Sequence, residues 1–222
     1  MRFAHLRLRA PNDRLRALVE FYGDRLGLAR AAASVTVGET RLELVPAAGG
    51  PFYHFALLVP GNRFDAALEW VAERTELLPR PDSADVVFDF DFWDAQACYF
   101  HDPAGNVVEL IAHRGVDETA AAGAFEGREL VGLSELGLVG DQRTMAATLA
   151  STLGLQVWDG SADEPQGLAF VGEKARTLIL APPGRGWLPT GRPAEPHEVE
   201  VALADGAPGA VALEGGRYRI TR

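Results

Sequence analysis

The chain has 222 residues, of which 47% are hydrophobic and 23% charged, so it is long enough to bury one large core or two small ones. Its formal net charge of −10 at pH 7 argues against nucleic acid or an anionic membrane as the main partner. The single cysteine, Cys98, excludes an internal disulfide and a cysteine-based zinc site, and it fits a reducing cytoplasm.

The first 45 residues predict a strand, a helix, and then two or three further strands. Residues 1–10 alternate in polarity like a strand and lack the apolar core of a signal peptide, and no apolar run is long enough to span a membrane. A helix follows with apolar residues at helical spacing, Asn12 or Asp13 as its N-cap and Gly27 as its end. Polar residues lie opposite the leucines in the first strand, as His5 and Arg7, and in the closing strand over residues 40–45, as Arg41 and Glu43.

The same order of elements repeats over residues 52–112. A strand over residues 52–59 carries His54, a helix is predicted from Asn62 to about Leu78, and further strands follow. The last two strands flank Asp102-Pro103-Ala104-Gly105-Asn106, a turn in which proline presets φ and glycine and asparagine tolerate positive φ. The final strand is apolar except for Glu109. This carboxylate either faces solvent or meets a cation, because burying it unpaired is costly.

A third unit and an incomplete fourth follow residues 114–129, an Ala- and Gly-rich stretch that we predict to be a linker. Residues 130–139 restart the pattern as a strand containing Glu135, and Asp141 opens a helix that ends in Leu153-Gly154-Leu155. A strand beginning at His197 opens a fourth unit that is too short to hold another helix. The repeat therefore predicts a domain over residues 1–113, the linker, and a truncated, degenerate domain over residues 130–222.

Histidine and glutamate fall at matching positions in the opening and closing strands of the first two units: His5, Glu43, His54 and Glu109. Any one of them, taken alone, is more often solvated or hydrogen bonded. Four at equivalent positions favour a shared divalent metal, because imidazole nitrogens and carboxylate oxygens bind Zn, Ni, Mn or Fe(II).

Three features carry a resemblance to a known superfamily: Phe21-Tyr22-x-x-x-Leu26-Gly27-Leu28, the two strand histidines, and Asp102-Pro103-x-Gly105-Asn106-x-x-Glu109-Leu110. They resemble the vicinal oxygen chelate superfamily, which includes glyoxalase I, extradiol dioxygenases and bleomycin resistance proteins. The resemblance implies an α+β fold, in which tandem βαβββ modules form a curled mixed-sheet cup, repeated in a second, incomplete domain. It also implies that His5, His54 and Glu109 are metal ligands, with Glu43 at the fourth ligand position of glyoxalase I.

The resemblance leaves two ways for the modules to pair. If neighbours pair, four ligands meet within residues 1–113, and the second half is a cup without metal, with Glu135, Ile179, His197 and about Arg219 at the equivalent positions. If modules pair across the halves, two sets of three result: His5, Glu43 and His197, and His54, Glu109 and Glu135. We favour neighbour pairing because it uses all four ligands of the first half.

The resemblance implies a metal-dependent enzyme acting on a small oxygenated metabolite, most like a glyoxalase I-type lyase or isomerase. The metal would chelate two adjacent substrate oxygens, Glu43 or Glu109 would move the proton, and a thiol cosubstrate is compatible with this interpretation. An extradiol dioxygenase using Fe(II), with Tyr99 as its active-site tyrosine, is the alternative. A non-enzymatic binding or resistance protein is the third interpretation, with a pocket lined by Phe88, Phe90, Phe92 and Trp93.

Arg7 and Arg41 lie on the predicted face of His5 and Glu43, so they are candidates to hold an anionic group of the substrate. Pairing with nearby carboxylates accounts for them more simply. The expected partner is a small molecule rather than nucleic acid or a membrane, and we expect a cytoplasmic monomer or homodimer.

Overall fold

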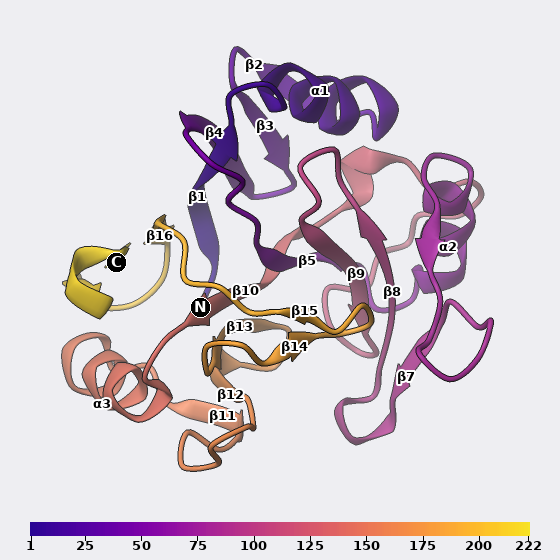
Figure 1. Ribbon diagram of the computed structural model, residues 1–222. Coiled ribbons are helices and arrows are strands. Elements are labelled where there is room, and N and C mark those ends of the chain that lie inside the picture. The colour runs from indigo at the N-terminus through magenta and orange to yellow at the C-terminus, as the bar shows by residue number, and fades with distance from the viewer.

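The computed structural model describes residues 1–222, and Figure 1 shows how its four successive units are arranged. The first unit contains β1 (Phe3–Pro11), α1 (Leu15–Glu20), β2 (Ala29–Ala31), β3 (Ser34–Val37) and β4 (Thr40–Ala47). The second contains β5 (His54–Val59), α2 (Phe64–Ala72), β6 (Leu77–Leu78), β7 (Phe88–Phe90), β8 (Ala95–His101) and β9 (Val107–His113). The third contains β10 (Gly132–Val139), α3 (Gln142–Leu153), β11 (Val157–Gly160), β12 (Ala169–Glu173) and β13 (Arg176–Ala181). A short ribbon, β14 (Gly186–Trp187) and β15 (Arg192–Pro193), precedes the fourth, which contains β16 (Val199–Leu203), β17 (Ala210–Leu213) and β18 (Tyr218–Thr221).

The strands form two mixed sheets, which confirms the predicted α+β class. One sheet has the order β17-β18-β16-β1-β4-β3-β2 and combines the first and fourth units. The other has the order β11-β12-β13-β10-β5-β9-β8-β6, with β7 paired to β8, and combines the second and third units.

Modules therefore pair across the two halves of the chain, and our preference for neighbour pairing is wrong. The junctions are antiparallel: β1 lies beside β16, and β5 lies beside β10. Each junction joins the opening strands of two units, so the edge that one unit exposes is covered by its partner unit. The boundaries at residues 113 and 130 stay a prediction about the sequence repeat.

Alternation along the central strands separates an apolar face from a face that lines the cup. On β9, Val108 and Leu110 belong to a core of 46 buried apolar residues that draws on both sheets and all three helices. Glu109 points the other way, between Val107 and Ile111, which belong to a smaller cluster of 14. The period of two in the strand thus places Glu109 in the cup.

The helices agree with the predicted positions but not always with the predicted ends. Arg14 precedes α1 as its N-cap, without a side-chain hydrogen bond, so the prediction of Asn12 or Asp13 was wrong, and a π-helix over Phe21–Arg25 continues α1. In α3, Asp141 accepts a hydrogen bond from the Thr144 amide, and Gly154 ends the helix in the left-handed conformation, as predicted. The helix predicted from Asn62 to about Leu78 is shorter, because α2 ends at Ala72 and residues 77–78 form β6. Asn62 does not cap it, since its side chain exchanges hydrogen bonds with the Thr119 backbone. No helix combines the length and apolar character needed to cross a bilayer.

The Asp102 turn joins the first unit to the second. The buried Asp102 carboxylate accepts a hydrogen bond from the Tyr22 hydroxyl at 2.7 Å and others from the Ala104 amide and from the backbone and side chain of Asn106. Asn106 in turn accepts a bond from the Tyr53 amide at 2.8 Å. The turn motif and Tyr22, in the π-helix that follows α1, are therefore one buried network.

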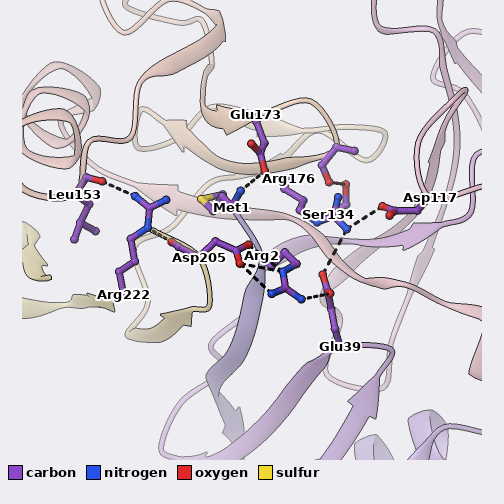
Figure 2. A network of polar contacts seen from close by, with 11 residues as sticks. Met1, Arg2, Glu39, Asp117, Ser134, Leu153, Glu173, Arg176, Asp205 and Arg222 are labelled. Carbon is purple, nitrogen blue, oxygen red and sulfur yellow. Dashed lines mark hydrogen bonds and ion pairs between the residues drawn. The ribbon is translucent and has the colours of Figure 1, made fainter. Parts of the chain in front are cut away.

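Ion pairs also connect the two sheets near the start of β1 (Figure 2). Arg176 of β13 lies 2.8 Å from Asp117 and 3.5 Å from Glu39, which belongs to the turn between β3 and β4. Arg2 lies 3.2 Å from Glu39 and 2.9 Å from Asp205, which follows β16. Since Glu39 contacts both arginines, the network links the loops of one sheet to those of the other.

Candidate metal centre and its cavity

His54, Glu109 and Glu135 meet in the cup of the second sheet, and we call them the His54 centre. One ligand atom from each residue lies within 4.8 Å of the other two, and all three side chains are buried. They come from three adjacent strands, β5, β9 and β10. Ala56 of β5 is in register with Glu109 on one side and with Glu135 on the other, so both carboxylates project from the face that carries His54.

The His54 ring is oriented as a metal ligand would be. Its Nδ1 lies 3.0 Å from the Val107 carbonyl oxygen, so Nδ1–H donates there and the lone pair of Nε2 faces the centre. Nε2 is 3.6 Å from a Glu109 oxygen. Burial lowers the pKa of His54 to about 4, which keeps the imidazole neutral at pH 7.

Glu109 and Glu135 have no cationic side chain as an ion-pair partner. Burial raises the pKa of Glu109, and the nearby charge of Glu135 raises it further; burial also raises the pKa of Glu135. No arginine or lysine lies within ion-pairing distance of either group. Two buried carboxylates and a neutral imidazole with its lone pair directed at them fit a divalent cation, which would offset the cost of burying the charges.

His5 and Glu43 lie in the other sheet, away from the His54 centre, with His5 Nε2 3.0 Å from Glu43. Arg7 is in register with Glu43 on β4 and with Glu200 on β16, just as Ala56 is with Glu109 and Glu135. Its guanidinium lies 3.5 Å from Glu43 and 3.2 Å from Glu200. This His5 cluster (His5, Arg7, Glu43 and Glu200) is thus a twin of the His54 centre in which an arginine replaces the alanine.

The sequence analysis did not identify Glu200 as a site residue, because it placed the start of the fourth unit's first strand at His197. In the structure this strand, β16, begins at Val199. His197 lies in the preceding loop, with its ring against Phe52 and Tyr53 and its Nε2 3.4 Å from Glu195. It does not join His5 and Glu43. Of the other predicted residues, Arg41 is exposed and outside the cavity.

A cavity of about 370 Å³ opens over the His54 centre. Tyr99, opposite Glu109 across β8 and β9, lines it, as do three of the four predicted aromatic residues, Phe90, Phe92 and Trp93. Phe88 packs behind Tyr99, with ring centroids 4.8 Å apart. The second half of the chain supplies a wall that the sequence did not indicate: Asp159, Leu168, Phe170, Arg185, Trp187 and Leu188.

Gly137 allows Trp187 to close this wall. A Cβ at position 137 would lie 2.7 Å from the Trp187 ring, so any larger residue would displace the indole. The Trp187 ring lies 4.9 Å from the His54 ring, centroid to centroid. A glycine in β10, two residues after Glu135, was the sequence signal for this close approach.

No protein-family model matches the sequence, and no curated protein matches it. Solved structures do. A putative dioxygenase from Bacillus subtilis subsp. subtilis str. 168 superposes with a TM-score of 0.58 at 15% identity, over 100% of this chain and 84% of the other. Glyoxalase I from Zea mays superposes with a TM-score of 0.53 at 16% identity, over 90% of this chain and 74% of the other. The chain has the vicinal oxygen chelate fold.

Within the vicinal oxygen chelate fold, the His54 centre occupies the cup formed by the second and third units, and the His5 cluster occupies the cup of the first and fourth. The fourth ligand position of the His54 cup, at the end of the third unit, carries Ile179, which cannot bind a metal and instead lines the cavity. A metal at this centre would therefore have three protein ligands and open positions facing the cavity.

Proposed function

We propose that the chain is a metal-dependent enzyme of the vicinal oxygen chelate type, acting on a small oxygenated molecule at the His54 centre. The observation that carries the proposal is the convergence of three buried ligand groups, without a protein cation, at the base of a cavity. The fold similarity to glyoxalase I and to a putative dioxygenase supports it.

The ligand set fits a divalent ion such as Zn, Mn, Ni or Fe(II), held by His54 Nε2 and by one oxygen each of Glu109 and Glu135. Such an ion supplies Lewis acidity toward two adjacent oxygens of a substrate. The largely apolar, aromatic walls of the cavity would displace water from the faces of a bound substrate, which strengthens electrostatic interactions at the base of the site.

The first candidate reaction is that of a lyase or isomerase, in which a proton is taken from a carbon next to a carbonyl. Glu43 lies in the other sheet, so Glu109 or Glu135 is the carboxylate available to accept that proton at its oxygen. Tyr99 would act as a hydrogen-bond donor to a substrate oxygen. Burial, followed by the charge of Glu109, raises the pKa of Tyr99 and keeps its hydroxyl protonated.

The second candidate is an extradiol-type dioxygenase using Fe(II). Two features favour it: Tyr99 lies beside Glu109, and a metal with only three protein ligands would keep open positions. The donor types favour it less, because non-haem Fe(II) oxygenases typically use two histidines and one carboxylate, and this centre offers one histidine and two carboxylates. We therefore place the lyase or isomerase first.

The metal content of the purified protein tests the proposal. We expect about one divalent ion per chain in the wild type, and its loss in Glu135→Gln and His54→Ala, because each removes one of only three ligands. Glu43→Gln and His5→Ala are matched controls from the twin cluster and should retain the ion. Circular dichroism would establish that each variant is folded.

Activity would then be screened with α-keto aldehydes plus a thiol, and with catechols plus oxygen. Turnover of the first class without oxygen supports the lyase, and oxygen consumption with the second supports the dioxygenase. A wild-type protein that takes up no metal when supplied with these ions would contradict both and leave a small-molecule binding protein as the explanation.

A further inference from the structure

Arg185 brings a positive charge to the wall of the cavity without a carboxylate partner. It lies between β13 and β14 and is partly buried. Its Nε donates to the Gln166 carbonyl at 3.3 Å and its Nη1 to the Gly186 carbonyl at 2.8 Å. These bonds fix the side chain against the backbone, and Nη2 makes no hydrogen bond within the protein. No acidic group lies within ion-pairing distance of it.

The charge of Arg185 acts within the cavity. Arg185 lines the cavity together with His54 and Trp187. The Arg185 side chain is partly buried, so its guanidinium is partly removed from water. An unpaired, partly desolvated guanidinium is a strong site for a carboxylate, sulfonate or phosphate group, which can accept its hydrogen bonds.

The remaining walls are flat and aromatic. Trp93 is at the middle of them: its ring lies 4.6 Å from Phe170, edge to face, and 5.0 Å and 5.7 Å from Phe92 and Phe90. Leu168 and Ile179 add aliphatic surface. Phe92, with 72% of its surface exposed, lies at the rim. A cavity of about 370 Å³ with such walls suits a ligand of one or two flat rings.

Asp159 is the one other charged group of the lining outside the His54 centre. Its carboxylate accepts a hydrogen bond from Trp93 Nε1 at 2.9 Å, so it helps to hold the indole in place. Its negative charge would repel an anion from that side of the cavity. The two charged walls therefore define one orientation for an anionic ligand, with its charge toward Arg185.

We propose that the cavity takes a planar aromatic compound that carries an anionic group, with Arg185 binding the anion and the walls around Trp93 contacting the ring. This inference rests on the proposed function, because it takes the cavity over the His54 centre as the place where substrate binds. It adds a substrate class, and a specificity-determining residue in a part of the chain that supplies no metal ligand.

The test compares two probes of nearly equal shape, 2-naphthalenesulfonate and the uncharged methyl 2-naphthyl sulfone, by calorimetric titration of the metal-loaded protein. A sulfonate is a weak metal ligand and the sulfone has no proton to lose, so the difference between the two reports mainly on Arg185. We expect the wild type to bind the sulfonate on the order of tenfold or more tightly than the sulfone, since a hydrogen bond to a charged group has about that effect. Arg185→Gln should remove this preference and leave binding of the sulfone unchanged.

Two further variants keep the test decisive. Arg143→Gln, at an exposed ion pair with Asp163, is the matched control and should retain the preference. Phe170→Ala should weaken both probes to the same degree, because it removes ring contact and no charge. Equal binding of the two probes, no binding of either, or a preference that survives in Arg185→Gln would overturn the inference.

The metal content of the same samples separates this inference from the proposed function. A protein that holds metal at the His54 centre but shows no preference for the sulfonate contradicts only the inference. A protein that holds no metal but prefers the sulfonate through Arg185 contradicts the proposed function, and the anion site remains.

Discussion

His113 is fully buried at the end of β9, and neither of its ring nitrogens has a well-formed hydrogen bond. Its ring lies 6.3 Å from that of Trp93, centroid to centroid. Burial, followed by the charge of Lys174, lowers the pKa of His113 to about 4. The folded protein therefore holds this imidazole neutral at a pH where the unfolded chain, with a histidine pKa of about 6.5, would protonate it.

This difference predicts an acid-sensitive stability. Between pH 6.5 and about 4 the unfolded state binds one more proton at His113 than the folded state, so the free energy of unfolding falls as the pH falls. The loss from this residue is at most about 3 kcal/mol. In His113→Phe the urea midpoint should fall less between pH 7 and pH 4.5 than in the wild type. Equal falls in the two proteins would contradict the assignment, and between pH 7 and 8 the two should change alike.

At the scale of elements, the Asp102 turn predicts a large effect from one substitution. Asp102→Ala would leave the buried Tyr22 hydroxyl, the Asn106 side chain and two backbone amides without their acceptor. We expect a loss of about 3 kcal/mol or more in the free energy of unfolding, measured with urea. Asp141→Ala, which removes the N-cap of α3, should cost only about 1 kcal/mol. A larger loss in Asp141→Ala than in Asp102→Ala would show that the hydrogen bonds of the Asp102 turn contribute little to the stability of the fold.

The junction of β1 with β16 and the junction of β5 with β10 differ at one central position, which is Arg7 in the first and Ala56 in the second. In the His5 cluster the guanidinium lies between two carboxylates where the His54 centre has room for a cation. We expect Arg7→Ala to gain a second, weaker equivalent of Zn or Mn, seen by calorimetric titration. Arg30→Ala removes another arginine of the first unit, which pairs with Asp24 and contacts no member of the His5 cluster, so it is the matched control and should keep the wild-type stoichiometry. A single equivalent in Arg7→Ala would show that geometry, and not the guanidinium, excludes a metal there.

At the scale of the whole molecule, the two halves of the chain depend on each other. Residues 1–113 contain β1 and β5, whose partners β16 and β10 lie in the second half, and the main core draws on both halves. A chain cut to residues 1–113 would expose two long strand edges and half of the core. We expect it to lack a cooperative thermal transition as a monomer and to bind no metal, because Glu135 is absent. A stable monomer with one bound ion would mean that the first half is an independent domain.

Local patterns in the sequence predicted the elements well, because they depend on neighbours within a few positions. The alternation around Glu109, the Asp102 turn, and the Asp141 and Gly154 ends of α3 are all set within one strand, turn or helix. The predicted start of α2 was wrong because a tertiary contact from Thr119 engages Asn62, the expected N-cap. Its predicted end was wrong because Leu77 and Leu78 pair with β8 as β6. The start of β16 was also misplaced, and for that reason His197 was taken as the candidate ligand instead of Glu200.

The sequence by itself determined the repeated order of strands and helices and indicated the candidate ligand residues, since these follow from periodicity and from the chemistry of single side chains, while the α+β class followed from the resemblance of its motifs to a superfamily. Only the tertiary structure decided which modules share a sheet. Strand edges are chemically alike, so pairing of β5 with β10 depends on how the whole chain packs. That pairing brings Glu135 to His54 and Glu109, separates them from Glu43, and adds Arg185 and Trp187 to the cavity wall.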